Sequence, residues 1–328
     1  MGGSLSSLPG SEMSVAPAVT FRSARPADLA ACAEIWRAAI NDYIGRLGQA
    51  ELTRDVGPLS RLYAHLQSSD PGRFIVAVRP GDSEEIVAFA AATVRERLWY
   101  LSMLFVLPRF QGTGLGRELV GRLMPTDGGM VRAVAADSAQ PISNALYAKL
   151  GMVPRMPLLN LSGLPERPEA FGALPSGVVP LAFDEIVAGP PGGQGHQLLT
   201  EAVDALDREL LGVAHPIDHR FLRSESRHGW LYRGPDGMPL GYGYAGEAGR
   251  VGPVAVLDQD LLGPVLGHLT SVVMPRGAFA MWLGGAADRA VVTALQAGFR
   301  LETFPVLLCW DEPFADFSRY LPGSPGLL

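Results

Sequence analysis

The sequence predicts an α+β protein built from two tandem repeats, each with a mixed, largely antiparallel sheet flanked by helices. Short apolar runs typical of strands alternate with segments whose apolar residues recur at helical spacing. The same order of segments occurs twice, in residues 19–163 and again in residues 177–328. In the first repeat, a glycine-rich turn joins a buried strand to an amphipathic helix, and this turn carries the functional prediction.

The elements of the first repeat follow one another with clear boundaries. Strands are expected over residues 19–23, 73–78, 85–94, 98–107, 130–135 and 158–161. A helix opens at Pro26 and ends before Asn41, a second covers residues 58–67, and another follows the glycine-rich turn. A further helix over residues 140–150 ends at Gly151, which fits a C-cap.

Length and composition limit the possible functions. A chain of 328 residues has room for two domains, and 48% apolar residues supply their cores. The net charge of −6 argues against a nucleic-acid partner, because no basic block could replace counterions. No apolar run is long enough to cross a bilayer, and residues 1–18 read as a disordered tail without the features of a secretory signal.

Cysteine usage and overall composition suggest a cellular context. Cys32 and Cys309 lie in apolar segments of different repeats, so we expect buried thiols in a reducing cytoplasm. No cluster of Cys and His has the spacing of metal ligands, so no metal is expected. Arginine replaces lysine almost everywhere and Ala, Gly and Pro are abundant, which is typical of a bacterial genome of high GC content.

The turn between the fourth predicted strand and the following helix has the chemistry of a pyrophosphate site. Gly112, Gly114 and Gly116 leave backbone amides accessible, and these amides stand at a helix N-terminus that favours negative charge. A P-loop would need a Gly-Lys-Ser/Thr run, but the chain has a single lysine, Lys149, outside the turn. The alternate glycines do not match the dinucleotide pattern G-x-G-x-x-G either.

The turn resembles the Q/R-x-x-G-x-G/A signature of the GCN5-related N-acetyltransferases (GNAT), which holds the pyrophosphate of coenzyme A. The resemblance rests on Val106, Pro108, Gln111, Gly114 and Gly116, placed after a strand and before a helix. It implies two acyl-CoA N-acyltransferase-like domains and acetyl-CoA as co-substrate. The cofactor-binding residues it implies are Leu104, Phe105, Val106, Gln111, Gly112, Thr113, Gly114, Leu115, Gly116, Arg117 and Asn144.

The family's next motif has a tyrosine just before a glycine, and Tyr147 with Gly151 matches it. The resemblance implies that the Tyr147 phenol protonates the departing thiolate, whereas an ordinary half-buried aromatic is the alternative. Where the family often has an asparagine seven residues before the tyrosine, this chain has Gln140, and Asn144 is the candidate for that polar role.

Three residues are candidates for binding or deprotonating the acceptor amine, and each has a structural alternative. Tyr43, with Asp42, follows the first helix and is a candidate substrate contact, although a surface loop fits equally well. Trp99 is also a candidate substrate contact, although it and its neighbour Tyr100 flank the active strand and one of the two should face the core. Glu96 is a candidate general base, and its alternative is a turn residue paired with a neighbouring arginine.

The second repeat keeps the order of elements and loses the chemistry. Val106 and Gly151 are 45 positions apart, and the corresponding Val256 and Gly298 are 42 apart. Two aspartates, Asp258 and Asp260, stand where the first repeat has its glycines, and they would repel a pyrophosphate. We therefore expect one active site, in the N-terminal repeat, with the C-terminal repeat closing the acceptor side or replacing a dimer partner.

The predicted organisation is a tail (1–18), an N-terminal catalytic domain (19–163), a proline-rich linker (164–176) and a degenerate C-terminal domain (177–328). The predicted activity is direct acetyl transfer to an amine of a small molecule or peptide, by a monomer or homodimer in the cytoplasm. A sensor that binds acyl-CoA without catalysis and a tandem acetyltransferase resembling mycothiol synthase are the alternatives. The run His215-Pro-Ile-Asp-His219 is expected in a surface loop or lining the acceptor pocket.

Overall fold

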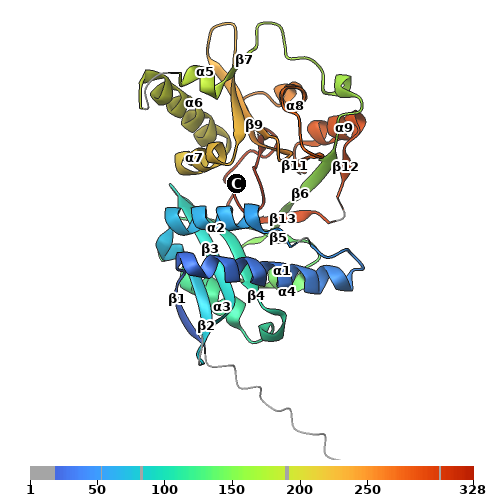
Figure 1. The fold of residues 1–328 in the computed structure, drawn as a ribbon. Coiled ribbons are helices and arrows are strands. Elements are labelled where there is room, and N and C mark those ends of the chain that lie inside the picture. Colours follow the sequence, from blue (N-terminus) through green and yellow to red (C-terminus); the bar gives the residue numbers. More distant parts are fainter. Residues whose placement is uncertain (1–18, 53, 82–83, 189–191, 303) are drawn as a thin grey trace, which may run out of the picture.

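The computed structural model describes residues 19–52, 54–81, 84–188, 192–302 and 304–328, so the predicted tail lies outside it. Both repeats contribute to one continuous sheet of 14 strands (Figure 1). The order of its main path is β1-β2-β3-β4-β5-β13-β6-β11-β10-β9-β8-β7, with β12 and β14 pairing beside it. The α+β class and the two repeats predicted from the sequence are therefore confirmed.

The N-terminal repeat has the predicted order of elements. They are β1 (Thr20–Ser23), α1 (Leu29–Arg46), α2 (Gly57–Ser69), β2 (Phe74–Arg79), β3 (Glu85–Arg95), β4 (Leu98–Val106), α3 (Leu115–Leu123), β5 (Val131–Asp137), α4 (Pro141–Lys149) and β6 (Val153–Gly163). Helix α1 runs five residues past Asn41, so the predicted end before Asn41 is wrong and Tyr43 lies inside the helix. An ion pair one turn apart between Arg46 and Asp42 supports this last stretch.

The C-terminal repeat follows the same plan. Its elements are β7 (Val179–Ala182), α5 (Phe183–Ile186), α6 (Gln194–Leu210), α7 (Pro216–Ser224), β8 (Arg227–Arg233), β9 (Pro239–Gly246), β10 (Arg250–Val256), α8 (Leu262–Val272), β11 (Phe279–Gly284), α9 (Asp288–Ala297), β12 (Arg300–Leu301), β13 (Val306–Trp310) and β14 (Tyr320–Leu321). Helix α7 contains His219, and His215 immediately precedes it. Both histidines are buried, so the predicted surface loop is wrong.

The two repeats exchange their last long strands at the centre of the sheet. Strand β13 of the C-terminal repeat pairs with β5 of the N-terminal repeat, and β6 of the N-terminal repeat pairs with β11. The exchanged strands also pair with each other, so the central order is β5-β13-β6-β11. The exchange is symmetric, because β5 and β11 occupy equivalent positions in the two repeats and each pairs with the last long strand of the other repeat.

Three apolar cores stabilise this sheet. One lies between the repeats and combines side chains of α1 and α2 with those of α6, α7 and the C-terminal segment. On the other face of the sheet, α3 and α4 cover a core in the N-terminal repeat. Helices α8 and α9 cover an equivalent core in the C-terminal repeat. Because the first core belongs to both repeats, their relative position is determined by packing.

The segment predicted as a linker is itself packed against the protein. A short 3-10 helix (Pro168–Phe171) places Phe171 in the core of the C-terminal repeat, where its side chain is 2% exposed. Gly267 of α8 makes room for it, because a Cβ there would come within 2.7 Å of the Phe171 side chain. None of the helices among the described residues is both long and apolar enough to span a membrane.

Candidate active site

Strand β4 diverges from its parallel neighbour β5 halfway along its length. The two strands pair only over Leu98–Leu101 of β4. On the other side, the register with β3 shifts so that Ala92 opposes Leu101 and Ala91 opposes Met103, which leaves Ser102 as a bulge. The backbone of Leu104, Phe105 and Val106 therefore faces an opening where β5 is no longer paired with it.

The glycine-rich turn lies at the end of this opening. Gly112 and Gly114 have φ values of 78° and 90°, and no other atom lies within 4 Å of where a Cβ would be. Within the described residues, the backbone amides of 112–117 donate no hydrogen bond, and the first helical bond runs from Glu118 N to Gly114 O at 3.1 Å. Six consecutive amides are thus available to an anion at the N-terminus of α3.

Polar side chains hold the turn in this shape. The Gln111 side-chain amide donates to the Val106 carbonyl at 3.0 Å and ties the turn to the end of β4. The Thr113 hydroxyl donates to the Phe110 carbonyl at 2.7 Å. Arg117 is exposed beside these amides, and it forms no ion pair among the described residues. The turn is therefore organised before any ligand binds.

Helix α4 brings two of the predicted residues to the same region. Leu146 approaches Gly116, since a Cβ on this glycine would lie 3.9 Å from the Leu146 methyl group. Asn144 donates to the carbonyls of Asp137 and Gln140 at 2.9 Å each. Its side-chain oxygen is buried and accepts no hydrogen bond, so a ligand amide could donate to it. The pantetheine arm of coenzyme A carries such amides, so Asn144 and the glycine-rich turn fit this group.

Tyr147 is 4% exposed and packs in the core beneath α3 and α4. Its hydroxyl forms no hydrogen bond with any described residue, in contrast to Tyr43 and Tyr100. Burial, followed by the nearby Cys309, raises the pKa of Tyr147 above its ordinary value. The phenol is therefore protonated at neutral pH, which is the state that a proton donor requires.

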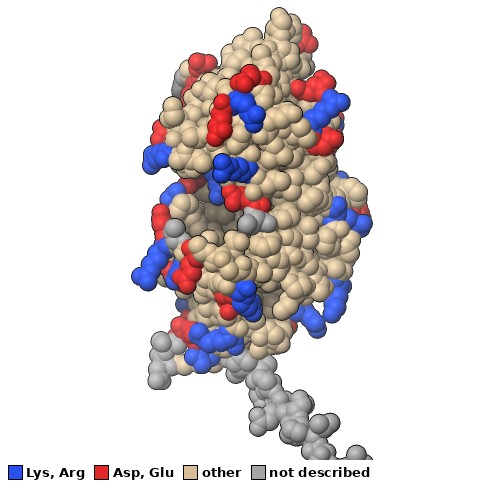
Figure 2. Space-filling view, turned by 90° about the vertical axis from the view of Figure 1, so that its right-hand side faces the viewer, with Lys and Arg blue, Asp and Glu red and all other residues tan. Residues whose placement is uncertain are grey.

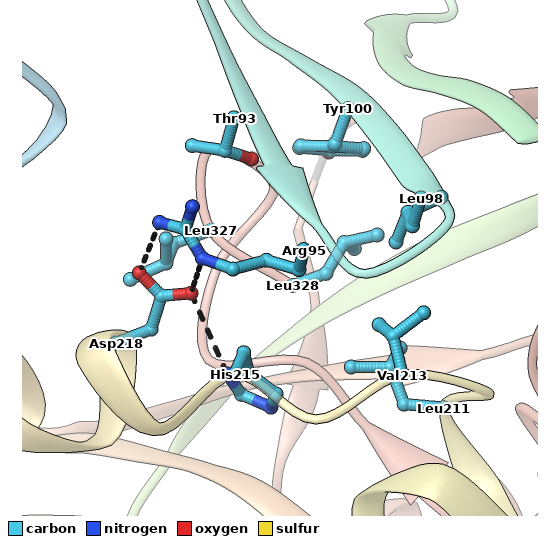
Figure 3. A pocket seen from close by; sticks show the side chains of 10 residues that line it. All are labelled: Thr93, Arg95, Leu98, Tyr100, Leu211, Val213, His215, Asp218, Leu327 and Leu328. Carbon is cyan, nitrogen blue, oxygen red and sulfur yellow. Dashed lines mark hydrogen bonds and ion pairs between the residues drawn. The ribbon is translucent and has the colours of Figure 1, made fainter. Parts of the chain in front are cut away.

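A small cavity of about 20 Å³ lies where the two repeats meet (Figure 3). Tyr100 of β4 lines it, together with His215 and Asp218 from α7 and its start. The C-terminal segment also reaches it: the Tyr100 hydroxyl donates to the Pro325 carbonyl and the Ser102 hydroxyl to the Gly326 carbonyl. The C-terminal repeat thus closes this side of β4. On the face shown in Figure 2, the surface is hollowed where the repeats meet, and charges of both signs are interspersed.

A buried ionic network joins the repeats beside this cavity. Asp218 binds the Arg95 guanidinium through both oxygens, at 2.6 and 2.8 Å, and accepts from His65 at 2.7 Å. Asp70 accepts a further bond from Arg95 at 2.9 Å. Burial alone would raise the pKa of Asp218, but the bonds from Arg95 and His65 outweigh it and hold this pKa well below the ordinary value.

A second buried cluster, Asp207 with His215 and His219, was not predicted. Asp207 lies 2.7 Å from His219 and 3.3 Å from His215 and accepts from Tyr242 at 2.5 Å. Burial lowers the pKa of His219, whereas the Asp207 charge overcomes burial at His215 and raises its pKa. The three residues could offer ligand atoms to a metal ion, since these atoms lie within 4.8 Å of one another. The sequence-based prediction concerned only clusters of Cys and His, whereas this one includes an aspartate, and its atoms are engaged in hydrogen bonds.

The remaining predicted residues have clear positions. The Tyr43 hydroxyl donates to Asp137, at the end of β5, at 2.5 Å. Trp99 is fully buried in the core under α3 and α4, so Tyr100 rather than Trp99 faces the cavity. Glu96 lies in the turn between β3 and β4, where its half-exposed carboxylate pairs with Arg208 of α6 at 2.9 Å. This ion pair fits the alternative of a charged turn residue.

The C-terminal repeat lacks an equivalent donor site. Asp258 caps a short 3-10 helix by accepting from the Asp260 amide at 2.9 Å, so this amide is already bound to a carboxylate. Asp260 in turn pairs with Arg289 of α9. The position matching Tyr147 is Ala294, which is fully buried.

Comparisons with known proteins agree with this geometry. Residues 36–152 match the model of the acetyltransferase (GNAT) family. No curated protein matches the sequence significantly. Among solved structures, a putative acetyltransferase from Pyrococcus horikoshii is similar over 98% of this chain and 99% of its own, with 14% identity and a TM-score of 0.71.

Two further structures share the fold. A GCN5-related N-acetyltransferase from Sphaerobacter thermophilus covers 92% of this chain and 98% of its own, with 19% identity and a TM-score of 0.58. A tandem GNAT protein from the clavulanic acid biosynthesis pathway covers 90% and 99%, with 15% identity and a TM-score of 0.51. The matched family model includes the glycine-rich turn and Tyr147, and the fold is shared over nearly the whole chain. Residues 36–152 therefore match a GNAT acetyltransferase domain, and nearly the whole chain shares the fold of these solved structures.

Proposed function

We propose that the protein transfers the acetyl group of acetyl-CoA directly to an amine of a small molecule or peptide, at one site in the N-terminal repeat. The observation that carries this proposal is the run of free amides at 112–117 beside the diverging end of β4. A pyrophosphate needs several convergent N–H donors, and such a run at a helix N-terminus supplies them.

The N-terminal repeat contains a series of groups suited to the length of the donor. The amides of the turn and Arg117 would hold the pyrophosphate. The unpaired edge of β4 at Leu104–Val106 and the free oxygen of Asn144 would hold the amides of the pantetheine arm. Acetyl-CoA supplies an activated acyl group as a thioester.

The chemistry then requires one bond to form and one to break. The amine nitrogen bonds to the thioester carbonyl carbon and releases a proton to solvent, from which the Tyr147 phenol is later reprotonated, while the carbon–sulfur bond breaks and its electron pair goes to sulfur. Tyr147 gives its hydroxyl proton to that sulfur, because burial keeps the phenol protonated. A neutral amine is needed for attack, and a lysine-like amine has a pKa of about 10.4 in water. Burial of the acceptor amine between the repeats would favour its neutral form by desolvation.

The contacts of Glu96 weaken its assignment as the base. Its carboxylate is 41% exposed and bound to Arg208, and it does not line the cavity. We propose instead that desolvation contributes most to amine deprotonation, and that Tyr43 with Asp137 orients the acceptor at the end of β5.

A thiol-release assay over a panel of amines tests this proposal. We expect release of CoA that depends on both acetyl-CoA and an amine, and its loss in Gly114→Glu, where bulk and charge would fill the pyrophosphate site. Calorimetry with acetyl-CoA on the same proteins separates binding from turnover. Binding without release by any amine would support a sensor, and normal acetyl-CoA affinity in Gly114→Glu would refute the proposed site.

A further inference from the structure

The C-terminal repeat has a cleft of its own, away from the acetyl-transfer site. It opens between α6, α7 and β9 and encloses about 570 Å³, counting its mouth. It lies on the face of the sheet covered by α6 and α7, whereas the degenerate turn of this repeat precedes α8 on the other face. The cleft is therefore separate from any remnant of a coenzyme A site.

Two arginines at this cleft have no anionic partner. Arg220 and Arg223 are three residues apart on α7, so both project from one side of the helix into the lining. Among the described residues neither forms an ion pair or a hydrogen bond, whereas Arg208 and Arg276 are each paired with a glutamate. A carboxylate would satisfy them, since guanidinium groups bind planar oxyanions through paired hydrogen bonds.

A carboxylate in the same cleft has an unused acceptor. Asp204 of α6 lines the cleft, and its Oδ1 is buried without a hydrogen-bond partner among the described residues. A buried acceptor left unpaired is costly, and an ammonium group offers three donors to it. The cleft thus presents positive charge and an unsatisfied negative group together.

Much of the remaining lining is apolar, and contacts hold several of its side chains in place. Phe183 meets the ring of Tyr244 edge to face, with centroids 5.3 Å apart. Gly229 of β8 fits under Phe183 because a Cβ there would clash with that ring. His219, also in the lining, is fixed by Tyr244 at 2.9 Å and Asp207 at 2.7 Å. These side chains need little rearrangement to receive an apolar group.

We propose that this cleft binds a small zwitterion with an apolar body, the chemistry of an aromatic α-amino acid. Arg220 and Arg223 bind its carboxylate, Asp204 accepts from its ammonium group, and Phe183, Leu199 and Tyr244 contact its side chain. This binding site lies in the C-terminal repeat, which lacks the glycine-rich turn of the N-terminal repeat.

Calorimetry on the full chain, without acetyl-CoA, tests the site with three probes. L-Phenylalanine carries both charges, 3-phenylpropionate lacks the ammonium group, and 2-phenylethylamine lacks the carboxylate. We expect phenylalanine to bind about tenfold or more tightly than either analogue, since each lost charged hydrogen bond costs about 1.5–3 kcal/mol. Equal affinities for the three probes, or no binding of phenylalanine, would overturn the proposal.

Variants locate the site. The double variant Arg220→Gln/Arg223→Gln should weaken phenylalanine binding about tenfold or more, and Asp204→Asn should weaken it similarly, on the same grounds. Arg276→Gln, at an exposed arginine outside the cleft, is the matched control and should bind as the parent does. Phenylalanine that binds equally well to the double variant occupies another site and refutes the proposal. Gly114→Glu should keep this binding, so the result is independent of acetyl transfer.

Discussion

Replacing Tyr147 by Phe removes one hydroxyl and tests the proposed proton donor. The hydroxyl forms no hydrogen bond among the described residues, so its loss breaks none. We expect the free energy of unfolding to change by less than about 1 kcal/mol. We expect kcat to fall about 100-fold, or about 2.7 kcal/mol of barrier, since a positioned general acid contributes at least that much. KM for acetyl-CoA should stay similar, because the phenol acts on the leaving sulfur.

The assay is steady-state thiol release with the best amine of the panel, and urea unfolding of both proteins accompanies it. Tyr63→Phe is the matched control, because Tyr63 is fully buried on α2 with an equally unpaired hydroxyl. This control should keep the parent kcat. An unchanged kcat in a folded Tyr147→Phe variant would refute the assignment and leave Tyr147 as a packing residue.

Three further changes test other parts of the molecule. Gly114→Glu should abolish measurable acetyl-CoA binding in calorimetry, because φ at this position is 90° and the side chain would fill the anion site, whereas Gly121→Ala on the same helix should bind normally. Asp218→Asn should lower the free energy of unfolding by about 1.5–3 kcal/mol at pH 7, because it weakens the charged hydrogen bonds from Arg95 while Asp70 still pairs with this arginine. The pKa of Asp218 is depressed in the folded state, so the stability that its charge contributes is complete above the unfolded pKa of about 3.9 and is lost as the pH falls further. Urea titrations should therefore show a smaller difference in the free energy of unfolding between parent and variant at pH 3 than at pH 7. Glu96→Gln should leave kcat and its pH profile unchanged, since this carboxylate already pairs with an exposed arginine; a large loss of kcat would restore Glu96 as the base.

Local patterns were sufficient to predict the centre of the site. Strand β4, the glycine-rich turn and α3 are each determined by nearby residues. The observed β4 agrees with the predicted strand to within a residue, and α3 follows the turn as predicted. The backbone at Gly112 and Gly114 is left-handed, which the glycines themselves indicate.

Long-range pairing could not be read in the same way. Residues 153–163 and 306–310 are apolar strands whichever neighbour they pair with, because burial on both faces looks the same in either arrangement. The residues around α7 resemble a surface loop because they are rich in His, Asp and Arg. Their partners, Arg95 and His65, lie more than a hundred residues away, so only the fold shows that these charges are buried.

The crossing of β6 and β13 has a consequence for protein engineering. Cutting the chain after residue 163 would remove the neighbours on both sides of β6 and leave β5 with an unsatisfied flank. Exposed strands of this kind pair with other chains, so an isolated first half would self-associate or be degraded. Any minimal version of this acetyltransferase must therefore retain residues 306–310, supplied either in the same chain or as a complementing fragment.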